Sequence, residues 1–417
     1  MAHTIAILAS IDTKKAEVGF LKSKIESGGF KTLIIDLSAQ GTYDFPVDIS
    51  REEVALAAGF TFSDLADAPK HEAITVMTNG IRALLLKLYE QGRFDGALSV
   101  GGLQNTVMAT AAMQLLPVGV PKLMLSTVAC GGRNFGNFVG TRDIIMIPSI
   151  ADLAGLNPVT EVLLSNVAAA CMGMLQHAGK TVQNSGSLIG ATLMGVTNDG
   201  VVQAVEMLEG RGLNVVSFHT TGVGGRCMEE LIDTGIIDAV MDLTLHEITS
   251  EEIFGGGFSA GAAGRLRVGA EKGIPMVVAP GGVDFVDFAV KDFQSGAIGD
   301  PKLRKYNLHN SEIAHIKLFK DEVVRAGEII TRRLNRSRGP VTMVIPLRGF
   351  RRDTLEGQPL YDPEVDEALI RVLESRLNPA IKILRVDANL NDEKFSRAAS
   401  DEMLKLLGRC EDASAKE

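Results

Sequence analysis

The sequence has no excess of positive charge, few cysteines and no apparent leader, and each of these absences excludes a class of protein. The 417 residues include 42 basic and 51 acidic side chains, which gives a net charge of −9. Divided after Lys180, the chain carries −2 in its first part and −7 in its second. Neither part has the basic excess that binding a phosphate backbone requires, so we expect no nucleic-acid partner.

The four cysteines, Cys130, Cys171, Cys227 and Cys410, are far apart in the sequence and form no CxxC pair. This spacing predicts neither a zinc knuckle nor a disulfide framework. Reduced thiols are typical of the cytoplasm, where we expect the protein to reside. The N-terminus, MAHTIAILAS, has no basic segment ahead of a long apolar run, so we expect no signal peptide.

Residues 96–121 contain no charged side chain, a composition that superficially resembles a membrane span. The segment is interrupted by Gly101-Gly102, Gln104, Asn105 and Pro117. A lipid-facing helix would leave such a broken backbone without hydrogen-bond partners. We therefore predict a buried strand, a tight loop and a buried helix here, and no membrane partner.

Short apolar runs alternate with amphipathic segments along the whole chain, which is typical of an α/β fold with mainly parallel sheets. We expect two Rossmann-like doubly wound subdomains, residues 1–180 and 186–417, that face each other across a cleft and are joined by the polar stretch 176–187. The two parts also share short patterns, such as FDGALSV from Phe94 and IDAVMDL from Ile237. Duplication and chance similarity both remain open explanations of these patterns. In such sheets, ligands bind beyond the carboxyl ends of the strands.

Asp12, Thr13 and Lys14 follow the first expected strand and begin a helical pattern. Exposed N–H groups and the helix dipole make such a turn a good anion site. Lys14 would add a positive charge beside a phosphate, and Asp12 would hold Mg²⁺ directly or through water. The alternative is a capped helix with solvated lysines.

Three further strand ends carry residues suited to a ligand. The second strand ends at Asp36, where doubly wound domains often hold a ribose hydroxyl, although a plain loop aspartate is the alternative. The third leads into Gly101-Gly102, Asn105 and Thr106, where glycines admit a ligand closely and buried polar groups need partners. A phosphate would supply those partners, whereas a tight turn with an Asn/Thr cap is the alternative. Thr127 follows the fourth strand at the same edge.

In the second part, His219 follows one expected strand and His246-Glu247 follows another. These residues are interpreted as a polar small-molecule pocket, with satisfied loop histidines as the alternative. Arg348 ends a later strand and suits a carboxylate or phosphate. His246-Glu247 begins like a zincin motif, but the second histidine is missing, so we expect no dedicated metal cage.

Several stretches, taken together, resemble the Tm-1-like ATP-binding domain family over nearly the whole chain. In the first part they are IDTK from Ile11, GGLQNT from Gly101, LPVGVPK from Leu116, LSTVA from Leu125 and DLAGLN from Asp152. In the second part they are LHE from Leu245, APGGVDF from Ala279 and IPLRG from Ile345.

The resemblance implies two Rossmann-like subdomains, ATP with Mg²⁺ at the first of them, and a homodimer. By position, it implies that Asp12, Thr13 and Lys14 meet the phosphates or the metal. It also implies that the nucleotide site is lined by Gly101, Gly102, Asn105 and Thr106. Gln104 is a departure, because the family's glycine loop tends to have a third glycine there.

We therefore expect a cytoplasmic protein that binds ATP and Mg²⁺ in its first subdomain. As an ATP-dependent enzyme, it would act on a small anionic metabolite held near His219, His246, Glu247 and Arg348 in the second subdomain. One alternative is a nucleotide-gated binding or regulatory module without turnover. Another is an ATP-independent lyase or hydrolase that uses His219 or His246.

Overall fold

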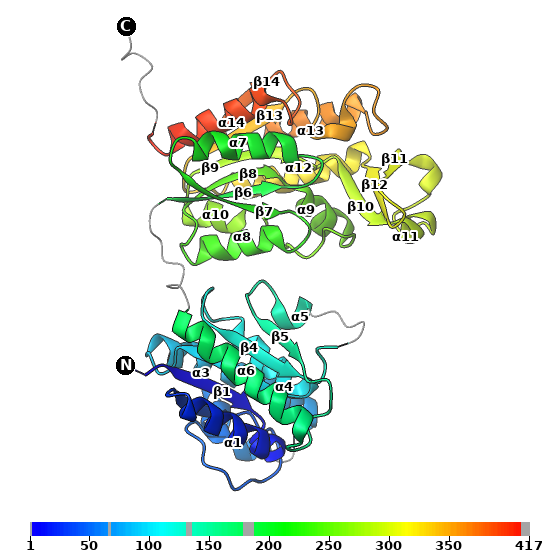
Figure 1. Ribbon diagram of the computed structural model, residues 1–417. Helices are drawn as coiled ribbons and strands as arrows, with labels where there is room; N and C mark the ends of the chain where they lie inside the picture. The colour runs from blue at the N-terminus through cyan, green and yellow to red at the C-terminus, as the bar shows by residue number, and fades with distance from the viewer. Residues whose placement is uncertain (1, 66–67, 131–135, 178–186, 410–417) are drawn as a thin grey trace. The chain divides into compact units, whose positions relative to one another are not determined.

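The chain folds as two α/β units, each built around one parallel sheet (Figure 1). The computed structural model describes residues 2–65, 68–130, 136–177 and 187–409. The units are Met1–Gln183 and Asn184–Glu417. Most of the expected linker, residues 178–186, lies outside the described residues.

The first unit alternates strands with helices, as the sequence predicts. Its strands are β1 (Thr4–Ala9), β2 (Lys31–Asp36), β3 (Gly96–Gly101), β4 (Lys122–Ser126) and β5 (Ile145–Pro148). Its helices are α1 (Ile11–Ser27), α2 (Arg51–Ala57), η1 (Phe62–Leu65), α3 (Lys70–Glu90), α4 (Leu103–Met113), α5 (Gly136–Val139) and α6 (Pro158–His177). β3 and α4 confirm that the uncharged segment is a buried strand, a turn and a helix.

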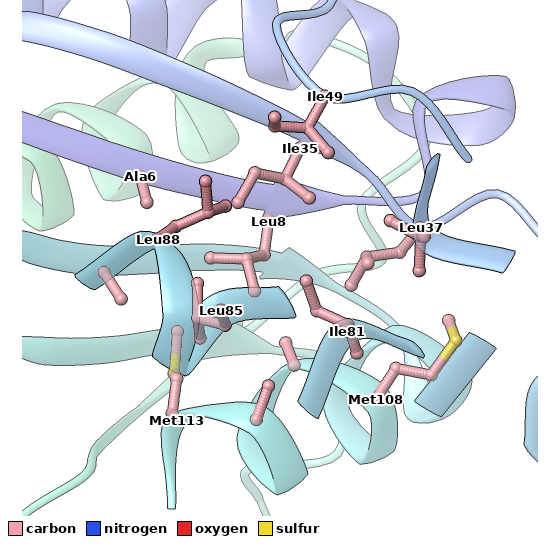
Figure 2. Close-up of a cluster of buried hydrophobic side chains, with 14 of the residues drawn as sticks. Ala6, Leu8, Ile35, Leu37, Ile49, Ile81, Leu85, Leu88, Met108 and Met113 are labelled. Carbon is pink, nitrogen blue, oxygen red and sulfur yellow. The ribbon is translucent and has the colours of Figure 1, made fainter. Parts of the chain in front are cut away.

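The five strands of this unit lie in the order β2-β1-β3-β4-β5, and every neighbouring pair is parallel. Side chains alternate between the two faces of a strand, so β1 contributes to two separate cores. Ile5 and Ile7 pack with α1 and α6 on one face. Ala6 and Leu8 pack with α3 and α4 on the other, where Ile81, Leu85, Met108 and Met113 surround them (Figure 2). Helices on both faces explain why these strands are continuous apolar runs.

The described residues of the second unit form nine strands. Its strands are β6 (Leu188–Leu193), β7 (Asn214–His219), β8 (Ala239–Thr244), β9 (Met276–Gly281), β10 (Phe285–Ala289), β11 (Tyr306–Leu308), β12 (Ile313–Lys317), β13 (Val341–Pro346) and β14 (Lys382–Val386). Its helices are α7 (Asn198–Glu209), α8 (Gly224–Asp233), α9 (His246–Ile248), η2 (Thr249–Phe254), α10 (Arg267–Lys272), α11 (Val290–Gln294), η3 (Pro301–Leu303), α12 (Lys320–Leu334), η4 (Arg352–Thr354), α13 (Pro363–Arg376) and α14 (Glu393–Leu406).

Six of these strands form a second parallel sheet in the order β14-β13-β9-β8-β6-β7. α7 and α14 pack on one face of it, and α12 and α13 pack on the other. The expected α/β class with two doubly wound, mainly parallel sheets is therefore confirmed. The chain between β9 and β13 contributes β10, β11 and β12, which form a small antiparallel sheet in the order β10-β12-β11. The sequence analysis did not predict this sheet.

Among the described helices, α6 is long and apolar enough to cross a membrane, with a mean hydropathy of 1.4 over the most apolar window. Leu164, Val167 and Cys171 on this helix pack into the core of the first unit. Core helices commonly meet the same criteria of length and composition, so α6 is weak evidence for a membrane span.

Candidate functional site

A pocket of about 430 Å³ lies beyond the carboxyl ends of β1 and β3 in the first unit. The chain leaves β1 toward β2 on one side, while β3 lies on the other side, so this is the point where the strand order reverses. Doubly wound sheets bind their ligands at this position. The pocket is lined by Ser10, Asp12, Thr13, Lys14, Ala39, Gln40, Lys70, Gly101, Gly102, Leu103, Gln104, Asn105 and Met108.

The start of α4 offers free main-chain donors to this pocket. Its N-cap is Gly102, no side chain caps it, and its first turn contains no acidic residue. Thr106 N–H donates to Gly102 O at 2.9 Å, whereas no acceptor is recorded in the described part of the chain for the amides of residues 103–105. Free amides and the positive end of the helix dipole together favour an anion.

The start of α1 differs, because its amides are engaged within the protein. Ile11 N–H donates to Asp36 Oδ1 at 3.2 Å, and Asp12 N–H donates to Ser38 Oγ at 3.0 Å. The amides of Thr13 and Lys14 both donate to Ser10 O. α1 therefore presents side chains to the pocket rather than free N–H groups.

Asp36, predicted to hold a ribose, is fully buried and does not line the pocket. Its Oδ1 also accepts hydrogen bonds from the Ser38 amide at 2.8 Å and from the Ser38 hydroxyl at 2.5 Å. These bonds fix the turn after β2 against the start of α1. In this structure, Asp36 lies outside the pocket lining and holds the start of α1 in place through the Ile11 amide.

Asn105 and Thr106 position α4 through buried hydrogen bonds. Asn105 Nδ2 donates to Ser99 Oγ at 2.8 Å and to Val100 O at 3.0 Å. Thr106 Oγ1 lies 2.7 Å from Ser126 Oγ, and the residue is fully buried. Asn105 lines the pocket, but Thr106 and Thr127 do not.

Three charged side chains line the pocket, and two of them come from the predicted turn. Asp12 Oδ1 is buried and has no hydrogen-bond partner among the described residues. Lys14 Nζ donates to Leu153 O at 2.6 Å. Lys70, the first residue of α3, was missed by the sequence analysis. It could have been found, because a helix that returns to the start of a parallel strand begins at the carboxyl edge.

In the second unit, His246 is fully buried. Its Nδ1 lies 2.9 Å from Gly282 O, and its Nε2 lies 3.3 Å from Asp287 Oδ1. Its ring stacks on Phe285 with the centroids 4.0 Å apart. Both ring nitrogens are therefore engaged within the protein.

Glu247 is also fully buried, and its carboxylate is held by several donors. Its Oε1 accepts hydrogen bonds from the amides of Gly222 and Gly225 at 2.8 and 3.1 Å, and its Oε2 pairs with the Arg265 guanidinium. These contacts tie the start of α9 to the loop that follows β7.

His219 and Arg348 are the two exposed members of the predicted metabolite site. Arg348 pairs with Asp387 through Nε and Oδ1 at 2.7 Å, and this pairing raises the pKa of the guanidinium above its ordinary value. Glu247 contacts the loop that follows His219, and His246 contacts Gly282. Arg348 contacts neither histidine nor Glu247 in the recorded hydrogen bonds and pairs with Asp387 instead. Among the described residues, no cluster of three or more His, Cys, Asp or Glu side chains is arranged to hold a metal ion.

Two family models match the chain. The N-terminal domain of "Uncharacterised protein family (UPF0261)" matches residues 3–180, and the C-terminal domain of the same family matches residues 186–407. A UPF0261 protein of Clostridium tetani is 36% identical over 411 residues, which are 98% of this chain and 100% of that protein. The ToMV resistance protein Tm-1(GCR237) of Solanum lycopersicum is 30% identical over 358 residues, which are 83% of this chain and 45% of that protein.

Solved structures show only distant likeness. A UDP-GlcNAc 2-epimerase from Neisseria meningitidis is 9% identical, with 89% of this chain and 99% of that chain covered, at a TM-score of 0.23. Acinetobacter baumannii MurG is 11% identical, with 97% and 100% covered, at a TM-score of 0.22. Likenesses this low carry no argument about the site.

Proposed function

We propose that this chain, which belongs to the UPF0261 family together with the tomato Tm-1 proteins, binds ATP with Mg²⁺ in the pocket of its first unit. Family membership confirms the resemblance noted in the sequence. The observation that carries the proposal is the start of α4, where free amides lie beside two lysines and an unpartnered carboxylate oxygen.

The phosphates fit the glycine loop and the lysines. Gly101 and Gly102 have no side chains to obstruct the approach to the α4 amides, and Lys14 and Lys70 place two ammonium groups on the pocket wall. Amides at a helix start and lysine ammonium groups are the donors that nucleotide-binding proteins use for phosphate oxygens. A triphosphate offers enough oxygens to use all of them together.

The nucleoside fits the remaining wall. Ala39, Leu103 and Met108 give the pocket an apolar side, and Leu103 is 49% exposed there. A flat base can cover this surface, and the Gln40 amide has a donor and an acceptor for the edge of the base. The pocket volume of about 430 Å³ lies in the range of small-molecule sites.

Asp12 is the residue suited to Mg²⁺. Its buried Oδ1 lacks a hydrogen-bond partner among the described residues, which is costly unless a cation or donor is supplied. Mg²⁺ is commonly held by one or two carboxylates together with phosphates and water rather than by an all-protein cage. When bound, Mg²⁺ would neutralise phosphate charge, while Asp12 would set its position.

The site favours a nucleotide-gated binding module over an ATP-dependent enzyme. Asp12 is the one carboxylate in the described lining, and we assign it to Mg²⁺, which leaves no histidine, cysteine or second carboxylate there to serve as a base beside the phosphates. His246 is engaged in buried contacts, which disfavours an ATP-independent lyase or hydrolase that uses this residue, whereas His219 is exposed. In the gated form, ATP binding would change homodimerisation or partner affinity while the nucleotide stays intact.

Isothermal titration calorimetry with ATP and Mg²⁺ tests the proposal. Lys14→Ala and Lys70→Ala should each weaken binding by about tenfold, because each removes one charge-assisted contact. Lys87→Ala is the matched control, since Lys87 is exposed in the last turn of α3, away from the pocket. Removal of Mg²⁺ should weaken binding to the unaltered protein and have less effect on Asp12→Asn.

Equal affinity in Lys14→Ala, Lys70→Ala and Lys87→Ala would contradict the proposed site. A second measurement distinguishes the nucleotide-gated module from the ATP-dependent enzyme. It follows phosphate release while the protein is incubated with ATP, Mg²⁺ and a mixture of small anionic metabolites. Intact ATP supports the gated module, whereas metabolite-dependent release of phosphate would establish the enzyme instead.

A further inference from the structure

We infer that segment 149–157, between β5 and α6, is a latch that ATP releases by drawing Lys14 away from it. The inference rests on the proposed function. The segment contains the DLAGLN motif from Asp152, and none of its residues lines the nucleotide pocket. α1 connects it directly to a lining residue of the pocket, Lys14, and Ser149 N–H also donates to Ser126 O at the end of β4.

Two side chains of α1 hold the segment in place. Lys14 Nζ donates to Leu153 O at 2.6 Å, and Glu17 Oε1 accepts from Gly155 N–H at 2.9 Å. Glu17 is 1% exposed, and Leu153 is fully buried in the core that α1 shares with α6. α1 therefore holds the segment at two points, and Lys14, at one of them, is a residue of the pocket wall.

Lys14 cannot fully serve the segment and the phosphates at once. An ammonium group binds a phosphate oxygen more strongly than a neutral carbonyl, because the acceptor is charged. When Lys14 turns to the nucleotide, the Leu153 carbonyl loses its donor at a partly buried position. A carbonyl without a partner is costly where water does not reach it fully, so the segment would shift to expose it.

Backbone strain in the segment favours this release. Ile150 has a φ of +61°, in the left-handed region that β-branched residues rarely adopt. Such a conformation persists only where surrounding contacts impose it. Ile150 is 80% exposed, and Leu156, Val159 and Val162 are exposed close by along the chain. Release would therefore rearrange an apolar surface, as a gated module requires.

Because the coupling is reciprocal, variants that loosen the latch should bind ATP more tightly. Gly155 has a φ of +97° and open space around it, so Gly155→Ala strains the latched segment without a clash. We expect it to raise the affinity for ATP and Mg²⁺ by about fivefold, the lower end of the left-handed penalty. Ile150→Gly relieves strain in the latched state and should lower the affinity.

The chain supplies a matched control. Gly29 also has a positive φ, +84°, and open space, but it follows the far end of α1 from the pocket. Gly29→Ala introduces the same kind of backbone strain without touching the latch. Its affinity for ATP and Mg²⁺ should equal that of the unaltered chain.

Hydrogen exchange reports the latch directly. Adding ATP and Mg²⁺ to the full chain should speed amide exchange in residues 149–157, whereas ordinary ligand binding slows exchange. Lys14→Met should abolish the change. The sequence contains no tryptophan, so Leu156→Trp provides a single fluorescent reporter of the same event.

Two outcomes would overturn the inference, and they are distinguishable. If calorimetry shows that ATP binds but exchange in residues 149–157 does not increase, and Gly155→Ala matches Gly29→Ala, the latch is wrong and the nucleotide site stands. If ATP with Mg²⁺ does not bind to the unaltered chain, the latch and the proposed function fail together.

Discussion

At the residue scale, His246 and Asp287 form a buried pair in the second unit. His246 Nδ1 lies 2.9 Å from Gly282 O, and its Nε2 lies 3.3 Å from Asp287 Oδ1. Burial alone would raise the pKa of Asp287, but His246 and the Ser259 hydroxyl more than offset this and lower it to about 2. The ionised Asp287 carboxylate is therefore stabilised in the folded protein by its contacts with His246 and Ser259.

This pair predicts a specific acid sensitivity. The folded-state pKa of Asp287 lies below its ordinary value of 3.8, so its stabilisation is present above about pH 4 and is lost as the pH falls toward 2. The loss corresponds to about 2 kcal/mol of unfolding free energy. In Asp287→Asn, urea unfolding from pH 5 to pH 2.5 should show a correspondingly weaker pH dependence. Asp233→Asn removes an exposed ion pair with Lys272 and is the control; equal pH dependence in the two variants would contradict the assignment.

Asp12 and Asp36 show what sequence can establish about a single residue. Both were placed at the carboxyl edge of the first sheet from strand positions alone, and both lie there. Asp36 accepts from three donors through Oδ1, while Asp36 Oδ2 and Asp12 Oδ1 have no hydrogen-bond partner among the described residues. Whether a polar atom is free depends on neighbours such as Ser38, and the spacing of residues does not reveal that.

At the element scale, the glycine loop between β3 and α4 gives two adjacent positions with different roles. A Cβ at Gly101 would lie 2.8 Å from the Asn105 Cβ, within a buried side-chain arrangement. A Cβ at Gly102 would have only Thr127 Oγ1 nearby, at 3.7 Å, and would stand in the pocket beside the free amides. Gly101 therefore serves packing, and Gly102 serves access.

We predict that Gly101→Ala lowers the unfolding free energy by about 1–3 kcal/mol, the usual cost of overpacking. Gly102→Ala should change stability by less than about 0.5 kcal/mol and yet weaken binding of ATP and Mg²⁺ by about tenfold through lost close approach. Urea unfolding and calorimetry on the two variants measure both effects. Gly102→Ala with unaltered affinity would show that phosphate does not approach the start of α4.

The elements missed by sequence analysis have physical reasons. The strands β10 and β12 read FVDFA and IAHIK, and each has a polar residue at its centre. Asp287 and His315 at these centres have charged or polar neighbours, so the apolar pattern breaks although these positions are buried. Lys70 was missed for a different reason, because the sequence analysis singled out residues that follow expected strands, and Lys70 begins a helix instead.

At the scale of the whole molecule, the two units repeat one strand order with different results. When the strands of each parallel sheet are numbered in chain order, the first five lie in the order 2-1-3-4-5 in both sheets. In the first unit, the ends of β1 and β3 border a pocket. In the second, the corresponding ends of β6 and β8 are bridged by Thr197 and Thr244, whose hydroxyl oxygens are 2.8 Å apart. Because this order is common among doubly wound sheets, it leaves both duplication and chance open, and the hydroxyl contact is a difference between the two sheet edges.

Because every lining residue of the pocket lies in the first unit, that unit should bind ATP by itself. Its two hydrophobic clusters contain only residues of this unit, so a fragment of residues 1–183 should also fold cooperatively. Urea unfolding of the fragment establishes folding, and calorimetry should then give an affinity for ATP and Mg²⁺ within about threefold of the full chain. The Lys70→Ala fragment is the matched control and should show the same weakening as the full-length variant. A folded fragment that does not bind, beside a full chain that does, would mean that the second unit supplies part of the site.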